Sequence, residues 1–236
     1  MGELEIWTEW ARGPLFRAAL AFMILGLLRH AALTIWELAG IMYRAGDKAF
    51  PWRRAFSATL KWLFPVGQIK NRVLYSLTTL GFHAAVIIVP VFLAGHVALW
   101  ERGTGLCWPT IPNGVADVLT IMAVLAAALL VAERAAARDS RALSRFQDYA
   151  LPLLVAAPFA TGFLVMHPAL NPFGHEATIL VHVLSADILF ILIPLTKLSH
   201  MILLPGTQII SELSWHFPPD AGRKVGVDLG KEKQPI

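Results

Sequence analysis

The sequence predicts an all-α fold, an integral membrane helical bundle of five transmembrane helices. Hydrophobic residues make up 56% of the 236 positions and charged residues only 15%, a composition typical of membrane proteins. Apolar runs long enough to cross a bilayer recur along the chain. They are expected at 15–43, 76–100, 115–132, 149–166 and 181–200. We expect the fourth run to be broken by Pro152 and Pro158.

The distribution of basic residues predicts the orientation. The stretch 44–75 after the first span holds seven lysine or arginine residues, and the loop after the third span holds four. The loop after the second span has only Arg102, and the loop after the fourth has none. Because loops rich in lysine and arginine stay in the cytoplasm, we expect the N-terminus outside and the C-terminus inside. Basic residues confined to loops between spans do not indicate a nucleic-acid partner.

The first residues argue against a signal peptide, and the cysteine content excludes several kinds of covalent or metal site. The first residues are acidic and lack a basic segment, so we expect no cleavable signal peptide. Cys107 is the one cysteine. A single cysteine excludes an intrachain disulfide, a covalent haem attachment through CxxCH and an iron–sulfur cluster held by this chain.

Two segments are expected outside the spans of the membrane domain at 1–210. Residues 44–75 interleave their basic residues with aromatic ones, a pattern typical of an amphipathic connector that lies on the cytoplasmic membrane surface. The same surface is suited to docking a partner, although contact with lipid alone would explain it. Residues 211–236 form a polar tail too short to bury a core of its own.

Histidines at two depths predict iron ligands. His182 and His200 lie eighteen positions apart in the fifth run, so in one continuous helix they share a face about 27 Å apart. His83 and His96 occupy the second run. With the expected orientation, His83 pairs by depth with His200 and His96 with His182. Facing helices that offer histidines at two depths are suited to two stacked bis-histidine haems. Separate boundary histidines are the simpler alternative.

The spacing in the second run conflicts with that of the fifth. In a continuous helix His83 and His96 are about 20 Å apart and about 140° apart around the axis. We expect kinks at Pro90 and Pro194 to absorb part of the difference.

The first run carries Arg29 and His30 at mid-depth. A guanidinium at the centre of a bilayer costs at least ~2.5–3.5 kcal/mol on insertion scales, so Arg29 should have a partner. A carboxylate, a haem propionate or a carbonyl at a helix end would serve. For His30 we expect a packed or hydrogen-bonded core histidine.

These segments resemble the gamma subunit of respiratory nitrate reductase and its relatives, the membrane cytochromes b of heterodisulfide-reductase-like and dissimilatory-sulfite-reductase-linked complexes. The matching pieces are GLLRH around Arg29, FHAAVIIVPVFLAGH in the second run and HVLSADILFILIPLTKLSH in the fifth. The thirteen-residue spacing of His83 and His96 exceeds that of nitrate reductase, and the loop after the second run has no lysine. Both departures favour a relative of that subunit over the subunit itself.

The resemblance implies a cytochrome b subunit in the cytoplasmic (inner) membrane of a bacterium or archaeon. It would act as the quinol-oxidising or quinone-reducing subunit of a larger oxidoreductase. Electrons would pass between quinone or menaquinone and an iron–sulfur partner subunit on the cytoplasmic side. Two b haems are implied, an inner one on His83 and His200 and an outer one on His96 and His182, with Arg29 serving a propionate. The quinone-site candidates are Gly95, His96, Arg102, Asp117, His175 and Glu176.

Two other functions stay open at this stage. One is a stand-alone membrane b-type cytochrome reductase with an acceptor outside the cytoplasm. The other is a non-redox membrane anchor or small transporter whose histidines relay protons.

Overall fold

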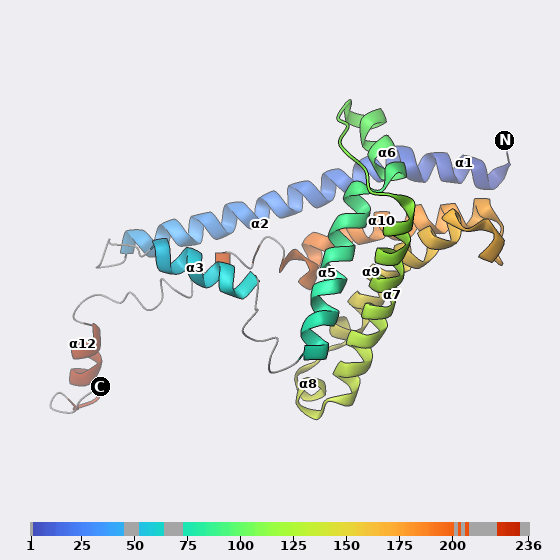
Figure 1. Ribbon diagram of the computed structural model, residues 1–236. Coiled ribbons are helices and arrows are strands. Elements are labelled where there is room, and N and C mark those ends of the chain that lie inside the picture. Colours follow the sequence, from blue (N-terminus) through green and yellow to red (C-terminus); the bar gives the residue numbers. More distant parts are fainter. Residues whose placement is uncertain are drawn as a thin grey trace. The chain divides into compact units, whose positions relative to one another are not determined.

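The structure, a computed structural model, describes residues 2–44, 52–63, 73–200, 203, 206–207 and 221–231. Every regular element in this part of the chain is a helix (Figure 1). Five helical stretches are long and apolar enough to cross a membrane: Glu3–Tyr43, Val73–Phe92, Asn113–Ala136, Phe146–Met166 and His175–Leu195. The protein is therefore an all-helical, multi-pass membrane protein, as its sequence predicts.

The chain divides into two compact units. The first consists of Met1–Met23 and Gly67–Ile193, and the second of Ile24–Val66 and Pro194–Ile236. Helices α2 (Phe16–Arg44) and α10 (His175–Leu195) contribute to both units. Each unit is described below by itself.

Three helices form the centre of the first unit. Helix α7 (Asn113–Ala136) packs against both α5 (Val73–Phe92) and α9 (Phe146–Met166) (Figure 1). The buried residues of α7 are small and recur at helical spacing: Ala116, Thr120, Ala123, Ala126 and Ala127. Small side chains let membrane helices approach closely, so α7 can lie between α5 and α9 and pack against both.

Helix α9 is continuous, so the prediction that prolines break the fourth span is wrong. Pro152 and Pro158 both lie inside α9. Membrane helices tolerate proline where other groups satisfy the carbonyls that lose a donor. Near the second proline, the Thr161 hydroxyl donates to the carbonyl of Ala157 at 2.8 Å. The carbonyl that Pro158 leaves without its helical donor is that of Leu154, so this bond supports the helix beside the proline and does not replace the missing one.

The second predicted span is two helices rather than one. Helix α5 ends at Phe92, Leu93 is extended (φ −67°, ψ 132°), and α6 (Ala94–Thr104) begins after it. Pro90 donates no backbone hydrogen bond, which weakens the ladder just before the break. His83 and His96 consequently belong to different helices, and the angle expected for one continuous helix does not apply.

A loop satisfies the carbonyls that this break frees. The Trp108 indole Nε1 donates to the carbonyl of Val91 at 2.8 Å. The amide of Ile111 donates to the carbonyl of Phe92 at 3.0 Å. Because unpaired carbonyls are costly inside a membrane, these two bonds stabilise the break.

The fifth predicted span also ends early. Helix α10 stops at Leu195, and a 3-10 turn, Lys197–Ser199, follows. In a continuous helix the Leu198 amide would donate to the carbonyl of Pro194, but it donates to the Thr196 side-chain oxygen at 3.3 Å. The expectation that His182 and His200 share one helix is therefore wrong.

The freed carbonyl of Pro194 has a partner from far along the chain. In the second unit, His30 of α2 places its Nε2 atom 2.8 Å from that oxygen. Gly26, one turn earlier, faces the Pro194 ring, and a side chain at Gly26 would collide with it. The prediction that His30 is a hydrogen-bonded core histidine is confirmed.

The remaining elements lie at the two ends of the chain and in the connector. The first span is longer than the ~20 residues that a bilayer needs, and it contains α1 (Glu3–Trp10) and a π-helical segment, Ala11–Leu15, around Pro14. Helix α3 (Trp52–Leu63) lies within the predicted connector. Helix α12 (Ala221–Asp228) lies in the predicted tail. The rest of the connector, apart from its two ends, and most of the tail fall outside the described residues.

Candidate haem site

Two of the four predicted iron ligands lie next to each other in the first unit. His96 is in the first turn of α6, and His182 is in α10. The centres of their rings are 6.1 Å apart, and the ring planes are parallel to within 2°. Both side chains are partly buried. These two residues were predicted to pair from their expected depth in the membrane alone.

The distance between the two ring centres, whose rings are stacked with parallel planes, equals the distance expected for two imidazoles bound to one metal ion. A nitrogen–metal bond is about 2.0 Å and the ring centre lies about 1.1 Å beyond the nitrogen, so two imidazoles on opposite sides of one ion have centres about 6.2 Å apart. A haem iron needs only two axial ligands from the protein. No group of three or more His, Cys, Asp or Glu side chains suited to a bare metal ion occurs in the described part of the chain.

The hydrogen bonds of His182 leave one ring nitrogen for a metal. Its Nδ1 atom lies 2.9 Å from the carbonyl of Pro158 in α9, and the Thr161 hydroxyl is 3.4 Å from the same nitrogen. A carbonyl only accepts, so Nδ1 carries the hydrogen and Nε2 keeps its lone pair. Metal-binding histidines are usually oriented by such a bond.

Gly162 of α9 provides the space for the His182 ring. A Cβ atom at this position would lie 2.9 Å from His182 Cε1 and 3.2 Å from Nδ1. Carbon atoms do not approach so closely without a shift. Two residues of α9, one turn apart, therefore fix the ring position. The carbonyl of Pro158 accepts the hydrogen bond of the ring, and Gly162 leaves the space that the ring occupies.

Gly162→Ala should displace the His182 imidazole and weaken haem binding at this pair. We expect about one of two haems to be lost or to bind with at least tenfold lower affinity, because metal sites lose about 10–100-fold when ligand orientation is disturbed. Haem titration followed by absorbance measures this. Gly103→Ala is the matched control, since a Cβ at Gly103 meets nothing within 4 Å. Equal haem affinity in both variants would contradict the assignment.

His96 reaches its position because the second span breaks. Its imidazole lies against the carbonyls of Val89 and Pro90 in the last turn of α5. The His96 Nδ1 atom is buried and has no hydrogen-bond partner in the part of the chain that the structure describes. A hydrogen bond from Nδ1 to one of these carbonyls would leave Nε2 for a metal, as in His182.

His83 and His200 show the same hydrogen-bond pattern but fall in different units. His83 Nδ1 lies 2.8 Å from the carbonyl of Thr79, and His200 Nδ1 lies 2.8 Å from that of Lys197. In both cases the carbonyl fixes the hydrogen on Nδ1. His83 belongs to the first unit and His200 to the second, and both side chains are exposed.

Arg29 lies on α2 in the second unit and is exposed. No carboxylate or carbonyl among the described residues pairs with it. The segment that carries His200 runs beside the same part of α2, because Pro194 contacts Gly26 and a side chain at Gly206 would collide with Thr34. The partner expected for Arg29 stays a prediction.

The six quinone-site candidates all fall in the first unit: Gly95, His96 and Arg102 on α6, Asp117 on α7, and His175 and Glu176 at the start of α10. Arg102 donates to the carbonyl of Ala98 in its own helix at 3.3 Å. Asp117 has a partner that is not among the predicted site residues. His167, at the end of α9, places Nε2 3.1 Å from Asp117 Oδ1.

The structure also reveals a buried acid that the sequence reasoning overlooked. Asp187 of α10 is 1% exposed, and neither of its carboxyl oxygens has a hydrogen-bond partner in the described part of the chain. An ionisable residue inside a membrane span is by itself a signal for function. That signal was present in the sequence, as a single aspartate within the apolar run 181–195.

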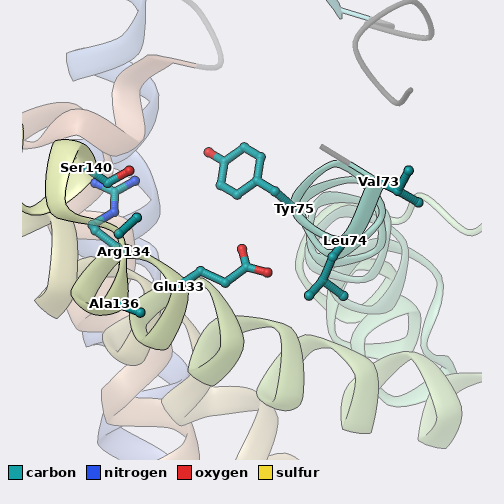
Figure 2. A pocket seen from close by; sticks show the side chains of 8 residues that line it. Val73, Leu74, Tyr75, Glu133, Arg134, Ala136 and Ser140 are labelled. Carbon is teal, nitrogen blue, oxygen red and sulfur yellow. The ribbon is translucent and has the colours of Figure 1, made fainter. Parts of the chain in front are cut away.

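A cavity of about 670 Å³ lies elsewhere in the first unit, between the start of α5 and the end of α7 (Figure 2). Its described lining includes Tyr75 and Glu133, and the Glu133 Oε2 atom is buried with no hydrogen-bond partner among the described residues. Arg134, beside them, pairs with Asp148 of α9 at 3.3 Å. None of the predicted site residues is among these lining residues.

Comparison with known proteins finds a relative of similar length. The chain is 32% identical over 199 residues to a protein of Nitratidesulfovibrio vulgaris (strain Hildenborough), covering 81% of this chain and 85% of the other. The name of that protein, simply "Protein", states no activity. No protein-family model matches the chain. No solved structure matches it.

Proposed function

We propose that this chain, which belongs to one family with the Nitratidesulfovibrio vulgaris protein, is the membrane cytochrome b subunit of a respiratory oxidoreductase. The observation that carries the proposal is the pair His96 and His182, with parallel rings 6.1 Å apart. Two imidazoles with nitrogens free to bind, in a membrane helix bundle, are suited to a b-type haem.

The chain's own residues would hold two haems. His96 and His182 would bind the outer one, with Pro158 and Gly162 fixing the ring of His182. His83 and His200 would bind the inner one, each oriented by a backbone carbonyl. When bound, b haems supply one-electron transfer across the low-dielectric core of the membrane. The substrate would be quinone or menaquinone.

Arg29→Leu should lower the midpoint potential or the occupancy of the inner haem. The guanidinium would pair with a propionate, and its positive charge favours electron uptake by a nearby iron. A redox titration of the purified variant measures the change. Arg138→Leu is the control, because Arg138 is an exposed residue of α8 (Arg138–Leu143), which belongs to none of the proposed sites. An unchanged titration with full haem content would assign Arg29 a structural role only.

The proposal includes an orientation and a partner. With the N-terminus outside and the C-terminus in the cytoplasm, α3 and the tail 211–236 lie on the cytoplasmic side of the inner membrane. We propose that they dock an iron–sulfur subunit, since this chain has one cysteine and cannot hold such a cluster itself. Trp215, Phe217, Arg223 and Lys224 of the tail are the predicted contacts. Within this set, Trp215 and Phe217 lie outside the described residues.

A transporter or anchor without redox activity is the second candidate. The buried Asp187, without a hydrogen-bond partner in the described part of the chain, favours it, because intramembrane acids often line proton pathways. A third candidate has the same haems but reduces an acceptor outside the cytoplasm. Optical spectra separate the second from the others, since only a haem protein shows reduced-minus-oxidised haem bands.

The test of the leading function uses the purified chain in its membrane complex. Menadiol, a water-soluble quinol, should reduce the haems, and an iron–sulfur subunit should co-purify at low salt and dissociate at high salt. Haems that respond to dithionite but not to menadiol would contradict quinone exchange. Crosslinks from the partner that map only to loop 105–112 or 167–174 would favour the acceptor outside the cytoplasm.

A further inference from the structure

The pair formed by His167 and Asp117 joins two helices at one end of the first unit. His167 ends α9, and Asp117 lies in the second turn of α7. His167 Nε2 is 3.1 Å from Asp117 Oδ1, and each side chain is 33% exposed. The two groups are therefore neither buried in the core nor fully in water.

The hydrogen bond assigns a role to each nitrogen of His167. An ionised carboxylate only accepts, so Nε2 carries the hydrogen that the bond needs. The lone pair then lies on Nδ1, to which no residue in the described part of the chain donates a hydrogen bond. A histidine held by a carboxylate, with its other nitrogen open, is the usual arrangement of a general base.

The surroundings fit an aromatic, apolar substrate. The Phe163 ring lies one turn before His167, with ring centres 4.3 Å apart. Gly162, which borders the His182 ring, is five residues before His167, or about 7.5 Å along the axis of α9. The pair thus lies on the same helix as the groups that position the outer haem ligand, one to two turns farther along.

We propose that His167 is the proton acceptor for quinol oxidation and that Asp117 positions it. The inference rests on the proposed function, which supplies the ferric outer haem as oxidant. A quinol O–H bond would break, its proton would bond to Nδ1 of His167, and one electron would pass to the outer haem. Once that electron had moved on to the inner haem and the imidazolium had lost its proton, the second proton and the second electron would leave by the same route, which gives the quinone. The exposed imidazolium returns each proton to water.

The test compares variants of the full chain purified with its haems. His167→Gln should reduce the rate of haem reduction by menadiol about 10²-fold, the usual size of a general-base contribution. Dithionite should still reduce all the haem. His167→Gly should show the same defect, and added imidazole should restore part of the rate. Asp117→Asn should lower the maximal rate while the menadiol concentration for half-saturation stays unchanged, and Asp139→Asn on the exposed α8 (Arg138–Leu143) is its control.

The outcomes separate this inference from the proposed function. If menadiol reduces the haems of the wild-type chain and of His167→Gln equally fast, His167 is not the acceptor, and the proposed function stands. If His167→Gln loses haem, or imidazole gives no rescue of His167→Gly, the pair only ties α7 to α9. If the wild-type chain contains haem that menadiol cannot reduce, the proposed quinone exchange fails and the acceptor role fails with it.

Discussion

Replacing His182 with alanine should leave the purified protein with one b haem in place of two, and His96→Ala should remove the same haem. Each iron needs both axial imidazoles, and the two rings already lie 6.1 Å apart and parallel. Either variant should lose about half of the haem absorbance. The double variant should lose no more than the single ones, because residues that act as one site are not additive.

His167→Gln is the histidine control for haem content, since its ring binds no iron in this account. Spectral components are resolved by redox titration of each variant. Retention of both haems in His182→Ala would contradict the assignment of the outer pair. Loss of both would indicate that His182 supports the fold rather than one site.

The second large effect concerns the inner pair. His83→Ala and His200→Ala should each remove the haem that survives in His182→Ala, and the combination of His83→Ala with His182→Ala should contain none. The reason is that the proposed inner haem takes one axial ligand from each residue, and each residue holds its hydrogen on Nδ1.

The components that each variant loses test the pairing by depth. If His83→Ala and His182→Ala abolish the same spectral component, the pairing is wrong. If His200→Ala retains both haems while His83→Ala loses one, another residue binds opposite His83.

Hydrophobic runs were enough to predict five spans, whereas the orientation expected from the charge bias stays a prediction. Apolar length is a direct requirement of the bilayer, so it is written locally in the sequence. The pairing of His96 with His182 was also predicted, because alternation of spans across a membrane determines depth. Both inferences need only distance along the chain and the direction of each span.

The positions of the helix breaks could not be predicted in the same way. Pro152 and Pro158 lie within a continuous helix, whereas helices end soon after Pro90 and Pro194. The difference lies in the groups that accept or donate near each proline. Trp108 bonds to the end of α5, and His30 bonds to the carbonyl of Pro194. His30 is 164 positions away from Pro194, and a local pattern carries no information about such a contact.

The candidate site shows the same limit. Gly162 looks like any glycine in a membrane helix until the His182 ring is seen beside it. No local pattern connects His167 with its partner, Asp117, because Asp117 is fifty positions earlier in another span. Asp187 differs, because a lone acid in an apolar run is a local signal that composition alone reveals.

The haem content of the purified wild-type chain tests the central claim most directly. The pyridine haemochrome assay counts non-covalently bound b haem per chain. This account predicts about two, one for each pair of imidazoles. A chain that folds, inserts into the membrane and contains no haem would contradict it and leave the transporter or anchor as the explanation of the intramembrane histidines and Asp187.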